Sequence, residues 1–141
     1  MKPGSMRELR DAVPRLPHAA PFLLLDRVLE VGEREGAFLK LVSAADPCVG
    51  ADGHLPSAFV LEALAQGAGA LLAALELAGA TPGYLAAVDD FRVLRDVRVG
   101  DALRVEVAIV RIFAGAILFR TRGLVDGTVC AEGRITLVLP R

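Results

Sequence analysis

Residues 47–74 read PCVGADGHLPSAFVLEALAQGAGALLAA, a polar loop that opens directly into a long apolar segment. Pro56 or Ser57 is expected to cap a helix there, because these residue types are favoured where helices begin. The helix is expected to run to about Leu77 and to stop at Gly79. This stretch decides the fold, because the rest of the chain has to cover such a helix.

Only Glu62, Gln66 and Glu76 interrupt the apolar character of the predicted helix. A helix that is apolar on nearly every face is expected to be buried all round. Gly67 and Gly69 each cost about 1 kcal/mol of helix propensity. We therefore expect neighbouring backbone or side chains to pack closely at these positions.

The segments on both sides of the helix have the apolar alternation of β-strands. Residues 22–44 predict a hairpin, residues 6–16 a short helix, and residues 45–55 a loop. Beyond the helix, strands are predicted over 84–88, 91–97, 103–113, 116–124 and 128–139. The sequence therefore predicts a single α+β domain over residues 1–141, in which a strongly curved antiparallel sheet wraps around one long central helix.

Composition excludes several classes of function. Sixteen basic and seventeen acidic residues give a net charge of −1, which argues against nucleic-acid binding. The longest charge-free stretch, between Glu62 and Glu76, is too short to span a bilayer, so no membrane insertion is expected. The N-terminus lacks the apolar core of a signal peptide, which predicts a cytoplasmic protein. The two cysteines have no metal-ligand spacing and no phosphate-binding loop occurs, so neither a metal nor a nucleotide cofactor is expected.

His54 and Glu62 are the candidate catalytic residues. A histidine near a helix entrance and a carboxylate on the same helix form a plausible acid/base pair. The backbone N–H groups of Ser57 and Ala58 could bind a developing oxyanion, with help from the helix dipole. Gln66, one turn beyond Glu62, is expected to orient the carboxylate or a neighbouring loop, or to be purely structural.

Four segments, in order and at matching spacing, resemble the hotdog-fold 3-hydroxyacyl-(acyl carrier protein) dehydratases of the FabZ/FabA type. They are LPHAAPFLLLDRVLEV (16–31), LEALAQGAG (61–69), AAVDDFRVLRDVRVGD (86–101) and LVDGTVCAEGRITLVL (124–139). The resemblance implies that a 3-hydroxyacyl thioester loses water to give the trans-2-enoyl thioester, with no cofactor beyond the substrate's own 4′-phosphopantetheine on acyl carrier protein or CoA. It also implies a homodimer or larger oligomer, because the family's histidine and carboxylate facing one substrate come from different subunits.

The active-site loop departs from the family pattern. The family has Gly-His-Phe-Pro and several further residues, including a Pro-Gly pair, before the helix, whereas residues 53–56 (GHLP) lead straight into it. One alignment makes His54 the catalytic histidine and deletes the turn. The other matches Pro56-Ser57 to the later Pro-Gly pair and gives His54 no catalytic position; this loop is similar to FabZ-like proteins of aryl-polyene gene clusters. His18, the only other histidine, matches a packing or turn position.

Two further functions stay open at this point. One is a non-catalytic acyl-binding subunit that forms a heterodimer with a second hotdog dehydratase. The other is a hotdog thioesterase in which Glu62 activates water. Arg92, Arg95 and Arg98 could receive an acidic carrier protein or a phosphate, or could form a solvated basic edge.

Overall fold

The computed structural model describes residues 23–77 and 84–139. The predicted helix over 6–16, His18 and the predicted helix stop at Gly79 lie outside these residues. The predicted hairpin over 22–44 is confirmed where it is described, because its two strands pair antiparallel.

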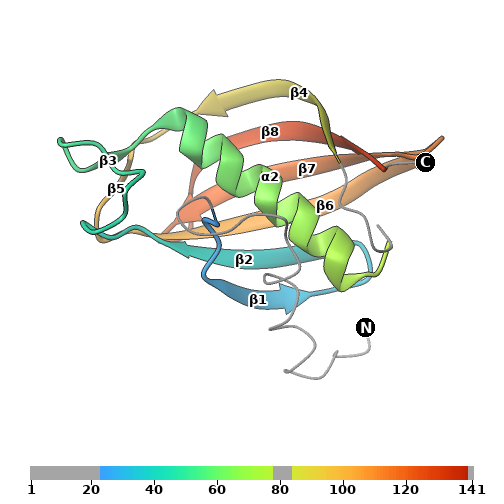
Figure 1. Cartoon of the computed structure of the whole chain (residues 1–141), viewed down its shortest axis with the longest axis horizontal. Coiled ribbons are helices and arrows are strands. Elements are labelled where there is room, and N and C mark those ends of the chain that lie inside the picture. The colour runs from blue at the N-terminus through green and yellow to red at the C-terminus, as the bar shows by residue number, and fades with distance from the viewer. Residues whose placement is uncertain (1–22, 78–83, 140–141) are drawn as a thin grey trace.

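Six strands form one antiparallel sheet in the order β1-β2-β6-β7-β8-β4 (Figure 1). Along its central strands, buried and exposed residues alternate, as expected for a sheet with one covered face. Two short strands, β3 and β5, form a separate pair. The strands are β1 Arg27–Val31, β2 Glu35–Leu41, β3 His54–Leu55, β4 Tyr84–Val93, β5 Val97–Arg98, β6 Ala102–Phe113, β7 Ala116–Val125 and β8 Thr128–Val138.

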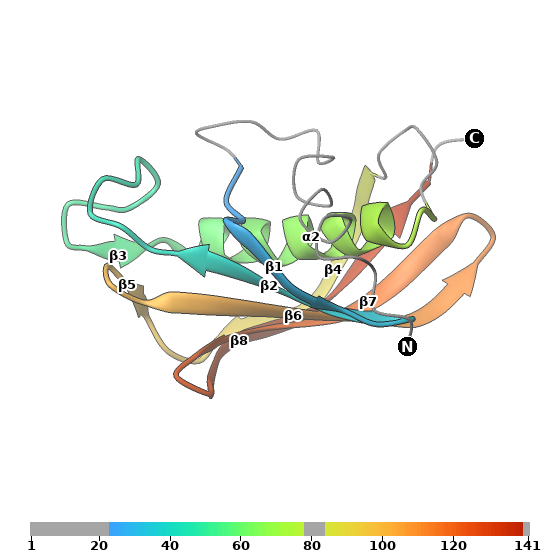
Figure 2. The same ribbon diagram turned by 90° about the horizontal axis from the view of Figure 1, so that it is seen from below.

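The single described helix, α2, runs from Ser57 to Ala74 and lies along the concave face of the sheet (Figure 2). By length and composition alone it could cross a membrane, but half of it is buried inside the protein, as in a core helix. A Cβ added at Gly67 would lie 2.6 Å from Val105 Cγ1 and 3.2 Å from Val107 Cγ1. The expected close packing is thus confirmed at Gly67.

Replacing Gly67 with alanine is expected to lower the free energy of unfolding by about 1–3 kcal/mol, because the added methyl overpacks a β-branched neighbour. This loss exceeds the roughly 1 kcal/mol that alanine gains in helix propensity. Urea titration measures the change. In a double-mutant cycle, Gly67→Ala and Val105→Ala should together cost less than the sum of their separate effects. A Gly67→Ala protein as stable as wild type would contradict the close packing.

Several predicted boundaries were wrong. The helix ends at Ala74 and not at Leu77, because Glu76 adopts a left-handed φ of 57°. The predicted strands 84–88 and 91–97 are instead one strand, β4, with a bulge between Asp89 and Arg92, followed by the separate strand β5. The predicted loop 45–55 ends in strand β3, because its last two residues pair with β5.

The helix is also not buried all round. Ser57 and Ala58 are exposed, and a stripe of residues at spacings of three and four is only half-buried: Glu62, Ala65, Gly69 and Ala73. The sheet of one chain covers only one side of the helix, so the opposite stripe stays partly open. Glu62 therefore lies on the accessible side of an otherwise buried helix.

Candidate functional site

The start of α2 offers two backbone donors. Pro56 is the N-cap, and its carbonyl accepts hydrogen bonds from the N–H groups of Phe59 (2.9 Å) and Val60 (3.1 Å). No side chain caps this helix end. Within the described residues, the N–H groups of Ser57 and Ala58 have no acceptor, as is usual for the first residues of a helix. These two N–H groups can bind an anionic oxygen at the positive end of the helix dipole.

Glu62 is held by a hydrogen-bonded chain that begins in a distant segment. The N–H of Leu24 donates to Gln66 Oε1 at 2.8 Å, and Gln66 Nε2 donates to Glu62 Oε1 at 3.1 Å. Gln66 is 1% exposed, and its carbonyl oxygen is fixed by a backbone donor, so its amide nitrogen has to face Glu62. Gln66 thus contacts both the carboxylate and a neighbouring segment.

Ala58, Glu62 and Gln66 lie on one face of α2, because they are spaced four residues apart. The backbone N–H of Ala58 points out of the start of α2 along the helix axis, and the Glu62 side chain begins one turn later on the flank that Ala58 shares. An acyl thioester lying along this face could contact both groups. This arrangement is the strongest chemical feature of the described residues.

His54 lies in β3, where it pairs with Arg98 of β5. Its N–H donates to Asp52 Oδ1 at 3.0 Å. Its ring atom Nδ1 lies 3.7 Å from Asp52 Oδ2 and 3.9 Å from Asp96 Oδ2. Two carboxylates thus face one ring nitrogen. In the part of the chain that is described, no hydrogen bond or ion pair joins His54 to Glu62.

The three arginines of the predicted carrier-docking segment have different surroundings. Arg92 pairs with Glu132 at 2.5 Å. Arg98 lies beside His54 in the β3–β5 ladder and is 3.8 Å from Asp96. Arg95 lies between β4 and β5, where its N–H donates to the Cys130 carbonyl at 3.1 Å. Of the three, Arg98 is the one placed beside the candidate histidine.

A buried ion pair that the sequence reasoning missed anchors the loop before β3. Lys40 Nζ contacts Asp46, and their side chains are 5% and 9% exposed. Asp46 also accepts the N–H of Cys48 at 3.0 Å. Lys40 follows Phe38 by two residues and faces the same side of β2, so the alternation in the strand could have identified it as an inward-facing lysine.

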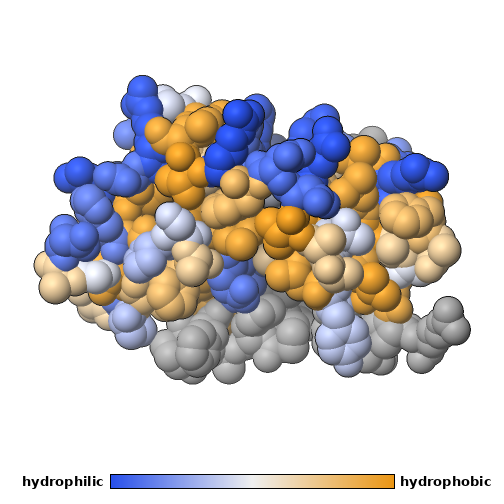
Figure 3. All heavy atoms as spheres, turned by 90° about the horizontal axis from the view of Figure 1, so that it is seen from above, coloured by the Kyte–Doolittle hydropathy of each residue, from blue (hydrophilic) through white to orange (hydrophobic). Residues whose placement is uncertain are grey.

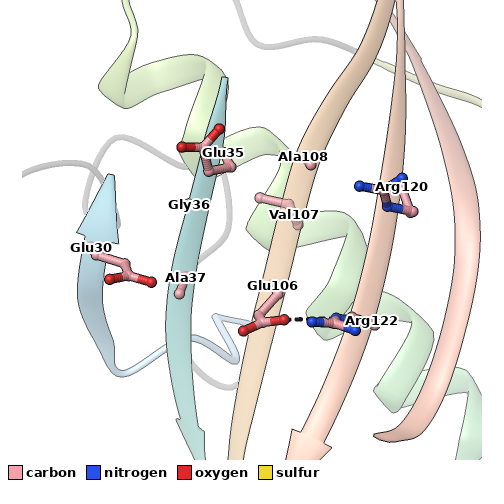
Figure 4. Close-up of a pocket in the computed structure, with 9 residues that line it drawn as sticks. All are labelled: Glu30, Glu35, Gly36, Ala37, Glu106, Val107, Ala108, Arg120 and Arg122. Atoms are coloured by element: carbon pink, nitrogen blue, oxygen red, sulfur yellow. Dashed lines mark hydrogen bonds and ion pairs between the residues drawn. The ribbon is translucent and has the colours of Figure 1, made fainter. Parts of the chain in front are cut away.

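The described cavities lie on the opposite, convex face of the sheet. One of about 330 Å³ is lined by Glu30, Glu35, Glu106, Arg120 and Arg122 with neighbouring backbone (Figure 4). A hydrogen bond from Arg104, reinforced by Arg122, holds the pKa of Glu106 below its usual range despite partial burial. Glu62 does not line this cavity or the neighbouring one beside Phe91 and Gly133. No group of three or more metal-ligating side chains occurs in residues 23–77 and 84–139.

Known proteins with similar sequences and structures agree with this layout. Residues 11–141 match the ApeP-like family, described as ApeP dehydratase. The FabZ 3-hydroxyacyl-[acyl-carrier-protein] dehydratase of Haemophilus influenzae (strain PittEE) is 36% identical over 138 residues, covering 91% of this chain and 90% of that protein. A chain of the dehydratase heterocomplex ApeI:P from Xenorhabdus doucetiae has a TM-score of 0.82 at 25% identity, covering 92% and 91% of the two chains.

Thioesterase superfamily member 2 from Mus musculus has a TM-score of 0.79 but only 12% identity, over 97% and 98% of the two chains. This likeness shows the shared fold and gives no support to thioesterase chemistry. The predicted α+β hotdog fold is thereby confirmed, as is the resemblance to dehydratases. The chain therefore belongs to the ApeP-like family of hotdog-fold dehydratases, related to FabZ, and is a hydro-lyase.

Proposed function

We propose that this chain removes water reversibly from a 3-hydroxyacyl thioester carried by acyl carrier protein, in fatty-acid or polyketide-like biosynthesis in the cytoplasm. The observation that carries the proposal is the face of α2 on which Gln66 holds Glu62 one turn from the N–H groups of Ser57 and Ala58. The FabZ relatives act on acyl-carrier-protein substrates by name. CoA thioesters share the same 4′-phosphopantetheine arm, and the reaction requires no metal or nucleotide.

The reaction requires two proton transfers, one to a base and one from an acid. A base removes a proton from C2 of the substrate while Glu62 donates a proton to the 3-hydroxyl, which leaves as water. The double bond forms between C2 and C3. Negative charge that develops on the thioester oxygen is stabilised by the N–H groups at the start of α2. Gln66 fixes the position of Glu62 through its link to Leu24.

The base is His54 of a second subunit. Within the described residues of one chain, His54 lies in a β-ladder beside Asp52 and Asp96 and forms no hydrogen bond or ion pair with Glu62. Asp52 and Asp96 lie on the Nδ1 side of the ring, so a substrate would approach Nε2. The half-buried stripe around Glu62 is the side of α2 that a second subunit would cover.

Strand β4 supplies the surface for this second subunit. It is an edge of the sheet, and an edge strand presents unpaired backbone groups that can pair with another chain. Figure 3 shows apolar residues gathered on the face that includes this edge. The large exposed side chains are Tyr84 (64%), Leu85 (50%), Val88 (36%), Val93 (37%) and Leu94 (52%). A homodimer through β4 is the proposed assembly.

A heterodimer with a second, catalytic hotdog subunit is the alternative. It is favoured by the shortened loop before α2. The similar Xenorhabdus structure is a heterocomplex by name. In this case the partner supplies the histidine, and this chain contributes Glu62 or binds the acyl chain.

Hydration of trans-2-enoyl thioesters, including enoyl-acyl carrier protein, tests both assemblies. The purified protein alone should turn over substrate, and His54→Ala should lower kcat by about 10²–10⁴-fold. His18→Ala, which removes the only other histidine, is the matched control and should retain activity. A folded wild-type protein that is inert alone would support the heterodimer. Full activity in His54→Ala would exclude His54 as the base.

A further inference from the structure

The β6–β7 hairpin ends in a turn without a polar side chain. Residues 112–119 read IFAGAILF, and Arg111 and Arg120 bracket them. The turn residues Ala114 and Gly115 have φ angles of 45° and 79°, as a two-residue hairpin turn requires. Gly115 fits the second position of such a turn, whereas Ala114 stands at the first, where Asn, Asp or Gly is usual. The turn therefore presents no polar side chain.

Large apolar side chains at the hairpin tip are exposed to solvent. Val110, Ile112 and Phe113 are 49%, 53% and 43% exposed. Val138, at the end of the adjacent strand, is 39% exposed and lies opposite Ala116. The guanidinium of Arg111 lies 5.1 Å from the centroid of the Phe113 ring. The tip is thus a small apolar surface with a cation stacked on its aromatic residue.

Two rows of cross-strand pairs, each further from the tip than the row of Phe113, contain arginines; each such row is called a level below. Arg111 pairs with Leu118, two residues from the row that contains Phe113, and Arg120 lies two residues further along β7. At about 3.4 Å per residue, the two levels are about 7 and 14 Å behind the tip. Arg120 lies opposite Arg134, and neither has an ion pair within the described ranges. Like charges directly opposite each other are unfavourable unless an anion compensates them.

We propose that this hairpin tip docks on a phospholipid membrane surface. Ile112 and Phe113 enter the boundary between headgroups and acyl chains, where apolar faces lie about 5–10 Å deep. Arg111, Arg120 and Arg134 then reach the level of the lipid phosphates, because long basic side chains extend toward the interface. No segment crosses the bilayer, so this contact differs from the membrane insertion that the sequence was expected to lack.

The position of the tip argues against a carrier protein as its partner. It lies beyond the C-terminal end of α2 (Figure 2), about 27 Å along the helix from the N–H groups that would bind substrate. A carrier protein that serves Glu62 would dock at the other end. Only β8 lies between the hairpin strand β7 and the β4 edge, and Val138 at the margin of the tip pairs with Tyr84 of that edge. The tip is therefore distinct from the carrier-protein end and adjoins the proposed β4 surface, so the particle-mass measurement below has to distinguish a membrane contact from an extension of that interface.

The cross-strand row that contains Arg120 and Arg134 has an acidic residue at each end. Glu35 lies beside Ala108 in β2–β6 pairing, and Asp89 lies opposite Arg134 in β4–β8 pairing. They balance the formal charges of Arg120 and Arg134 in this row, so Arg111 contributes the excess positive charge near the tip. We therefore expect apolar contact to supply most of the binding and anionic lipid to strengthen it modestly.

A tryptophan reporter tests the docking directly, because the chain contains no tryptophan. Phe113→Trp should show a blue-shifted emission when vesicles of phosphatidylcholine with about 30% phosphatidylglycerol are added. Leu41→Trp, at a residue that is 52% exposed at the far end of β2, is the matched control and should not shift. Unchanged emission from Trp at position 113 would overturn the proposal.

Vesicle co-sedimentation gives the second test. Ile112→Ser/Phe113→Ser should lower the partition of the protein onto the same vesicles by about ten-fold or more. Leu29→Ser/Leu41→Ser removes two other exposed apolar side chains (36% and 52% exposed) and should bind like wild type. If wild type does not sediment, and Ile112→Ser/Phe113→Ser instead lowers the particle mass in solution, the tip is a protein interface and the proposal fails.

Discussion

Glu62→Gln is expected to lower kcat for enoyl-thioester hydration by about 10²–10⁴-fold, the usual contribution of a positioned acid or base. Glutamine keeps the size of the side chain and can still accept the hydrogen bond from Gln66, but it cannot exchange a proton with the 3-hydroxyl. Because binding contacts are preserved, KM should change much less than kcat. Steady-state kinetics with a trans-2-enoyl thioester separate these two effects.

Glu76→Gln is the matched control for this substitution. Glu76 is an exposed carboxylate just beyond the end of α2, and its loss changes the net charge by the same amount. It should leave kcat and KM near wild type. Retention of full activity by Glu62→Gln would show that Glu62 is structural and would move the acid to another residue or to the partner.

Lys40→Met is expected to lower the free energy of unfolding by about 3–5 kcal/mol, because it leaves the Asp46 carboxylate buried without its cation. The double variant Lys40→Met/Asp46→Leu should recover much of this loss, because an apolar pair of similar volume often replaces a buried ion pair at little cost. Urea titration of the three proteins at pH 7 measures the effect. Equal stability of Lys40→Met and wild type would contradict a structural role for the pair.

The same ion pair predicts a dependence of stability on pH. Burial alone would raise the pKa of Asp46, but the Lys40 ammonium and the Cys48 N–H outweigh burial and hold the pKa below its usual range. The contribution is therefore present above the unfolded-state pKa of about 3.9 and is lost as the pH falls through the lower folded-state pKa. The stability difference between wild type and Lys40→Met should accordingly shrink as the pH falls below about 4.

The type and order of the main elements could be predicted because they depend on local patterns. The apolar run that begins at Ser57 was sufficient to predict the helix. The alternation of apolar and polar residues over 103–139 was sufficient to predict the last strands. The predicted ends of the helix and strands were wrong where the end depends on the backbone conformation of one residue or on pairing with a distant strand. Glu76 ends the helix through its backbone conformation, and the bulge between Asp89 and Arg92 keeps β4 continuous. A single domain over residues 1–141 stays a prediction.

The candidate site was predictable in its residue types but not in its contacts. Glu62 and Gln66 were identified by their isolation in an apolar helix, and their mutual hydrogen bond follows from their spacing. The link from Gln66 to Leu24 spans 42 residues, so no local pattern could show it. The catalytic roles of His54 and Glu62 stay predictions until the variants are measured.

The sequence by itself determined that an apolar helix carrying one carboxylate would pack against a curved antiparallel sheet, because its apolar surface has to be buried. Only the tertiary structure decided which groups meet. Strand register places His54 beside Arg98, Lys40 reaches Asp46 in the loop, and the open stripe of α2 exposes Glu62. These residues are distant in the sequence and meet only after loops close and strands pair. The interaction energies that favour these contacts over others therefore depend on the register of the assembled sheet.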